Sequence, residues 1–108
     1  MNSKKKGSAG ERELCEILQQ AGFDEAHRND QRYTSGLENP DVALTGYHVE
    51  VKRAERFNAY EAMAQAEHDA NGKCTPIVAH RRNRKPWLVV MHLTDWLKLI
   101  KGEKHDAL

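Results

Sequence analysis

The fold is decided by one stretch of this 108-residue chain, Asn39-Pro40-Asp41-Val42-Ala43-Leu44-Thr45-Gly46-Tyr47-His48-Val49-Glu50-Val51-Lys52-Arg53. Turn-forming residues surround Pro40, and Gly46 supplies a second turn. Short runs with β-branched residues stand on either side of Gly46. The stretch therefore predicts a β-hairpin.

The hairpin should gather three charged side chains. Alternate side chains of a strand share a face, so Glu50 and Lys52 should lie together, opposite Val49 and Val51. The valines should face the core. Antiparallel pairing across the turn would bring Asp41 back beside Glu50 and Lys52.

Two carboxylates and a lysine at one point suit a particular chemistry. Carboxylate oxygens are preferred ligands of hard cations such as Mg²⁺ or Mn²⁺. Such a cation activates water and polarises a phosphoryl oxygen, and a lysine stabilises the negative charge that grows on the phosphate. The pattern predicts phosphodiester hydrolysis. The alternative is an exposed Glu50–Lys52 ion pair, worth about 0–1 kcal/mol.

Periodicity predicts the other elements of the chain. They are a helix from Ser8 to Gln20 or Ala21, an irregular segment over 23–38, a helix over 58–71, strands over 76–80 and 87–92, and a helix over 95–101. The order αββαββα predicts an α/β fold with a small mixed sheet flanked by helices. We expect one domain over 1–108, with 1–7 and 103–108 flexible.

Glu11 continues the apolar stripe of the first predicted helix, and a buried charge needs a partner. Ser8 to Glu11 fits a capping box, in which the glutamate bonds to the first amide of its own helix. Alternatively, Glu11 faces a metal shared with Asp41 and Glu50. The segment by itself favours the cap, whereas the motifs of the whole chain favour the ligand.

The net charge is only +1, but the basic residues are clustered. Charge runs are usually solvated surface, yet focal basic patches also suit DNA phosphates. The irregular segment is long enough to be functional. Candidate phosphate contacts are Arg28, Arg32, Arg81, Arg82, Arg84 and Lys85.

Several classes of protein are disfavoured. No apolar run is long enough to cross a membrane, and no apolar segment follows the basic N-terminus, so we expect an intracellular protein. Cys15 and Cys74 are too few for a disulfide scaffold and are expected to be reduced. The histidines show no metal-ligand spacing, which disfavours a histidine-metal enzyme.

Pro40-Asp41, followed after eight residues by Glu50-Val51-Lys52, resembles the PD-(D/E)XK nuclease motif. The segment from Lys6 to Leu14 resembles the opening of archaeal-type Holliday junction resolvases and related phage nucleases. The segments 60–70 and 76–87 resemble a phage-encoded branch of the same superfamily. The resemblance covers most of residues 5–100 and implies a restriction-endonuclease-like fold.

The resemblance also implies roles for individual residues. The implied metal ligands are Glu11, Asp41 and Glu50, with Lys52 as the catalytic lysine. DNA contacts are implied for Arg12 and for a loop arginine that is either Arg28 or Arg32, and Gln65 is a possible accessory residue. The family further implies Mg²⁺ or Mn²⁺, branched DNA as substrate, a homodimer and, for a phage-encoded protein, the host cytoplasm.

These observations favour a divalent-metal-dependent DNA endonuclease that acts on branched DNA in the manner of a Holliday junction resolvase. Two alternatives keep the same fold: a DNA-binding module without cleavage activity, and a nuclease that acts on non-junction DNA. A purely structural domain would leave the grouping of Asp41, Glu50 and Lys52 unexplained.

Overall fold

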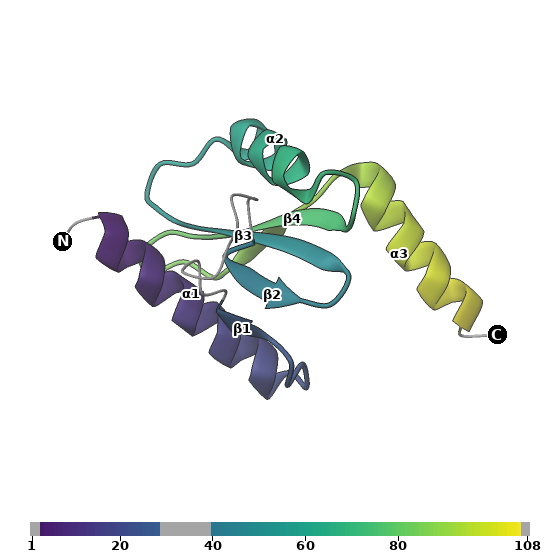
Figure 1. Cartoon of the computed structure of the whole chain (residues 1–108), viewed down its shortest axis with the longest axis horizontal. Helices are drawn as coiled ribbons and strands as arrows, with labels where there is room; N and C mark the ends of the chain where they lie inside the picture. The colour runs from purple at the N-terminus through teal and green to yellow at the C-terminus, as the bar shows by residue number, and fades with distance from the viewer. Residues whose placement is uncertain (1–2, 29–39, 107–108) are drawn as a thin grey trace.

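The computed structural model describes residues 3–28 and 40–106 (Figure 1). Its elements are α1 (Ser3–Gln20), β1 (His27–Arg28), β2 (Val42–Leu44), β3 (Tyr47–Arg53), α2 (Ala59–Ala70), β4 (Thr75–Arg81), β5 (Leu88–Val90) and α3 (Leu93–Asp106). This is the predicted order with one additional short strand, β1. The prediction of an α/β fold with a small mixed sheet flanked by helices is confirmed.

The strands form a five-stranded sheet in the order β1-β2-β3-β4-β5. The β2–β3 hairpin is antiparallel, as predicted, with Val42 opposite Val49. Gly46 makes its turn at φ 87°, a backbone conformation that L residues with a side chain rarely adopt. Strands β3 and β4 run parallel, so α2 serves as the crossover between them.

Helices cover both faces of this sheet (Figure 1). Apolar residues of α1 pack on one face in a cluster of Leu14, Cys15, Val42, Val49, Val51 and Ala79. Small residues of α2 pack on the other face in a cluster of Ala62, Met63, Ala66 and Val78. The two valines of β3 therefore face a core, as predicted, but the opposite face of β3 is covered as well.

The α2 helix follows its local sequence signals closely. The Asn58 side chain caps its first turn by accepting a hydrogen bond from the Glu61 amide at 3.1 Å. Asn71 ends the helix in the left-handed conformation, at φ 51°. Both ends are set by residues whose side chains suit those positions. This fixes where α2 lies over β3 and β4.

Both terminal helices differ from their predicted bounds. Helix α1 begins at Ser3, so Ser8 lies inside it and the capping box with Glu11 is wrong. Helix α3 begins at Leu93, two residues before its predicted start, and continues to Asp106. Residues 3–7 and 103–106 are thus helical; their flexibility stays a prediction.

Helix α3 projects from the sheet and makes little contact with the other described elements (Figure 1). Its predicted apolar stripe is exposed: Trp96 is 48%, Leu97 46% and Ile100 37% accessible. The helical period was therefore read correctly, but the stripe does not pack on the described part of this chain. No described helix has both the length and the hydropathy needed to cross a membrane.

Candidate functional site

Asp41 is held at the start of β2 by two backbone contacts with β3. Its amide donates to the Val49 carbonyl at 2.9 Å, and its Oδ2 accepts from the Val51 amide at 2.9 Å. These bonds extend the hairpin by one step and fix the Asp41 carboxyl beside the residue between the two valines. That residue is Glu50, so the predicted pairing of these carboxyls is present.

Glu50 lies beneath α2 and is only 4% exposed. It is paired in register with Val78, whose side chain contacts α2. The pKa of the Glu50 carboxyl is raised from 4.5 to about 8, first by burial and then by Asp41 and Asp69, against the lowering effect of Lys52. Near neutral pH this carboxyl retains its proton unless a cation joins it.

Glu11 comes to the same region from α1. Its Oε1 accepts a hydrogen bond from Arg28 Nε at 3.2 Å. Its pKa is raised first by burial and then by Asp41, against the lowering effects of Arg28 and Arg12. Asp41 thus raises the pKa of carboxyls on both sides of it, and the structure brings the three predicted carboxylates into one electrostatic group.

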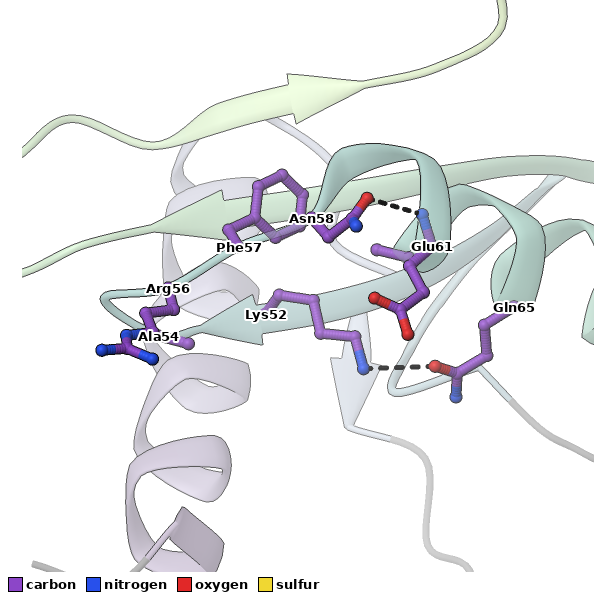
Figure 2. Close-up of a pocket in the computed structure, with 8 residues that line it drawn as sticks. Lys52, Ala54, Arg56, Phe57, Asn58, Glu61 and Gln65 are labelled. Carbon is purple, nitrogen blue, oxygen red and sulfur yellow. Dashed lines mark hydrogen bonds between the residues drawn. The ribbon is translucent and has the colours of Figure 1, made fainter.

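Lys52 lies two residues beyond Glu50 on the same face of β3. Its Nζ donates to Gln65 Oε1 of α2 at 3.3 Å (Figure 2). Both side chains line a pocket of about 250 Å³ between the end of β3 and the start of α2. The lysine therefore sits at an opening to solvent, while Glu50 is enclosed behind it.

The predicted DNA contacts fall in two places. Arg12 is exposed on α1 next to Glu11, and Arg28 is exposed on β1. Arg32 lies outside the described residues. The basic segment from Arg81 to Lys85 begins at the last residue of β4. It lies at the edge of the sheet where β3 also ends, because Lys52 of β3 is paired with His80 of β4.

The residues of this basic segment differ in whether their side chains are already bonded within the chain. The guanidinium of Arg81 is bonded to Glu13 and, through Nε, to the Lys85 carbonyl at 2.7 Å. Glu13 also accepts from the Trp87 indole at 2.7 Å. Arg82, Arg84 and Lys85 are exposed. Arg81 thus has a structural role in the turn, and the other three are available to a ligand.

Sequence reasoning missed two neighbours of Glu50. His48 Nε2 lies 2.8 Å from Glu50 Oε1, and His48 is 2% exposed. Asp69 of α2 also reaches this point: ligand atoms of His48, Glu50 and Asp69 lie within 4.8 Å of one another. The shared strand face of His48 and Glu50 was readable from their spacing, whereas Asp69 required the position of α2.

The donor set fits a hard divalent cation. Glu11, Asp41 and Glu50 offer carboxylate oxygens, and burial, followed by Asp41, raises the pKa of both Glu11 and Glu50. Among the described residues, the group with ligand atoms within 4.8 Å of one another is His48, Glu50 and Asp69, so Glu11 and Asp41 stand further from it. A divalent cation would compensate the negative charges of these carboxylates. The residues present are therefore compatible with Mg²⁺ or Mn²⁺.

The fold is similar to that of a solved nuclease. The structure of Hjc from Archaeoglobus fulgidus, a Holliday junction resolvase from an archaeal hyperthermophile, aligns with a TM-score of 0.61 and 25% sequence identity. The alignment covers 79% of this chain and 76% of Hjc. No protein-family model and no curated protein sequence matches the chain. The restriction-endonuclease-like fold is thus shown by structure.

Proposed function

We propose that this protein is a divalent-metal-dependent DNA endonuclease that acts on branched DNA. The observation that carries the proposal is the position of Asp41, whose carboxyl raises the pKa of both Glu11 and Glu50. Acidic side chains whose pKa values are raised by burial and by a neighbouring carboxyl are typical of functional sites, including those that bind a cation. The motif resemblance and the likeness to Hjc support nuclease chemistry and a junction substrate.

Glu11, Asp41 and Glu50 would hold Mg²⁺ or Mn²⁺. When bound, such a cation activates water and stabilises charge on the phosphate oxygens. Lys52 adds a positive charge at the mouth of the site, where it stabilises the growing charge on the phosphate. Gln65 restrains the lysine side chain through the 3.3 Å hydrogen bond. We assign Gln65 a positioning role for that reason.

Exposed arginines and one lysine lie next to the site, where they would contact the phosphates of the DNA backbone. Arg12 and Arg28 flank Glu11 on one side, and Arg82, Arg84 and Lys85 stand beyond the end of β3 and β4 on the other. Phosphate contacts of this kind fix the register of DNA without reading its sequence. Such contacts suit a DNA substrate that is recognised by its shape. We expect the protein to meet this substrate inside the cell.

Cleavage tests this proposal directly. Purified protein should cut a four-way junction in preference to a flap or linear duplex when Mg²⁺ or Mn²⁺ is added. Asp41→Asn and Lys52→Ala should abolish cutting while junction binding remains, and Glu67→Gln, an exposed change on α2, should cut normally. Junction binding without cutting under either metal would favour the binding module, and equal cutting of all three substrates would favour the non-junction nuclease.

We propose further that the enzyme is a homodimer whose subunits meet through β5 and α3. The exposed large apolar residues of this region are Leu88, Val89, Leu93, Trp96, Leu97, Leu99 and Ile100. Leu93, Trp96, Leu97 and Ile100 recur at helical spacing on α3, which makes little contact with the other described elements. An exposed apolar stripe of this kind is typical of a protein–protein interface.

A second copy is the occupant that the proposed substrate favours. A two-fold dimer joins the same surface of each subunit, so the apolar stripe of one α3 would pack on that of the other. Two subunits would also match the two symmetric strands of a junction.

The oligomeric state of the protein in solution tests the proposed interface. Sedimentation should show a dimer at micromolar concentration for the wild-type protein and a monomer for Trp96→Asp. Tyr60→Asp, which changes an aromatic residue that is 90% exposed on α2, should remain dimeric. A monomeric wild type, or a dimer that persists in Trp96→Asp, would contradict this assignment.

A further inference from the structure

A mixed cluster of one imidazole and two carboxyls lies between β3 and α2. His48 and Glu50 project from β3 and are 2% and 4% exposed, and Asp69 reaches them from the last turn of α2. His48 Nε2 is 2.8 Å from Glu50 Oε1. One ligand atom from each residue lies within 4.8 Å of the others.

One imidazole and two carboxyls share this enclosed point. His48 and Glu50 are almost inaccessible to solvent, and Asp69 of α2 is half-buried. Nitrogen and oxygen donors that converge in this way are ligands that a metal cation can use.

We propose that His48 Nε2, Glu50 Oε1 and the Asp69 carboxylate form a binding site for a first-row transition-metal cation of the Zn²⁺ and Mn²⁺ class. One nitrogen and two oxygen ligands suit these cations better than Mg²⁺, which prefers oxygen ligands throughout. Three protein ligands leave a further position for water. Binding releases the proton shared by His48 and Glu50, because both must act as ligands through lone pairs.

This site shares Glu50 with the one proposed for cleavage and differs from it in its other ligands. Asp41 and Glu11 belong to the cleavage site alone, and His48 and Asp69 to the new site alone. The inference does not rest on nuclease activity, because metal binding at His48 is measurable in a protein that never cuts DNA. Asp41 and Asp69 are therefore the residues that tell the two sites apart.

Cobalt(II) is a suitable probe, because its visible absorption reports nitrogen and oxygen ligands and it substitutes for Zn²⁺. The full-length protein should bind one Co²⁺ with a visible spectrum that Zn²⁺ displaces. Asp69→Asn and His48→Gln should each weaken this binding at least tenfold. Asp41→Asn should retain the spectrum with a shifted midpoint, because Asp41 contacts Glu50, and the exposed-surface control Glu67→Gln should retain both the spectrum and its midpoint. Circular dichroism checks the fold of each variant.

Two results would overturn the inference. One is a Co²⁺ spectrum that is absent from the wild type or unchanged in both Asp69→Asn and His48→Gln. The other is a spectrum lost in Asp41→Asn but kept in Asp69→Asn, which would place the ion among the predicted carboxylates. Asp69 is only half-buried at the end of α2, so its amide variant keeps the test decisive should His48→Gln fail to fold.

Discussion

Replacing Glu50 with glutamine should stabilise the protein at alkaline pH and leave it unchanged near pH 4. In the folded chain the pKa of Glu50 is about 8, against an ordinary value of 4.5. Below pH 4.5 the carboxyl is protonated in both the folded and unfolded states. Between 4.5 and 8 it ionises only on unfolding, so the folded state loses stability as the pH rises, and above 8 the loss levels off.

The size of this effect follows from the same two values. One pKa unit corresponds to about 1.4 kcal/mol, so the loss between pH 4.5 and 8 amounts to at most about 5 kcal/mol. Burial causes most of it, followed by Asp41 and Asp69. Because Glu50 titrates together with its neighbours, we expect about 2–5 kcal/mol. Glutamine has the same shape and can still bond to His48.

Urea unfolding at pH 5, 7 and 8.5 without divalent metal measures the effect. As the pH rises across this range, the free energy of unfolding of the wild type should decrease progressively relative to that of Glu50→Gln. His48 acts in the opposite direction, since its lowered pKa favours the folded state as pH rises, but both proteins share it. The difference between them therefore reports Glu50 together with the His48 and Asp41 groups that it contacts.

Two comparisons sharpen this experiment. Glu16→Gln, an exposed change on α1, should follow the wild type at every pH. Added Mg²⁺ should stabilise the wild type more at pH 8.5 than at pH 5, because a cation favours the ionised carboxyl. A constant difference between wild type and Glu50→Gln from pH 5 to 8.5 would refute the reasoning.

Three further substitutions test the packing around the site by chemical denaturation. Gly10→Ala should cost about 1–3 kcal/mol, since the new Cβ would lie 2.8 Å from Arg53 Cβ where α1 crosses β3; an unchanged midpoint would mean that the helix shifts freely. Asn58→Ala should cost about 1 kcal/mol by removing the cap of α2, and Asn58→Ser should restore most of it. Glu13→Ala should cost about 1–3 kcal/mol because the Trp87 indole loses its acceptor, with a matching change in tryptophan fluorescence.

Local signals predicted most of the fold. The β2–β3 hairpin follows from Gly46 and the alternating valines, and α2 follows from its small apolar face and its Asn58 cap. The two-residue strand β1 escaped prediction because its place is set by pairing with β2, not by its own sequence. Helix α1 begins before Ser8 because Ser3 to Gly7 hold no residue that forbids a helix.

Local signals in the sequence also predicted part of the candidate site. Hairpin register is a local property, so Asp41 and Glu50 were expected together, and their contacts agree. The contact of Glu11 with Arg28 joins α1 to β1 across 17 residues and could not be read from spacing. Asp69 was missed because only the packing of α2 on β3 brings it to Glu50.

The burial of Glu50 is the feature that strand alternation alone could not supply. Alternation assigned His48, Glu50 and Lys52 to the face away from the valines, and a helix that covers this face turns a polar edge into a buried site. A buried carboxyl whose loss of stability grows to as much as about 5 kcal/mol by pH 8 is costly for a domain whose total stability is typically about 5–15 kcal/mol. Valine at this position would complete the core with no such loss. The presence of a carboxyl between Val49 and Val51 therefore agrees with the proposal that Glu50 helps to hold a divalent cation.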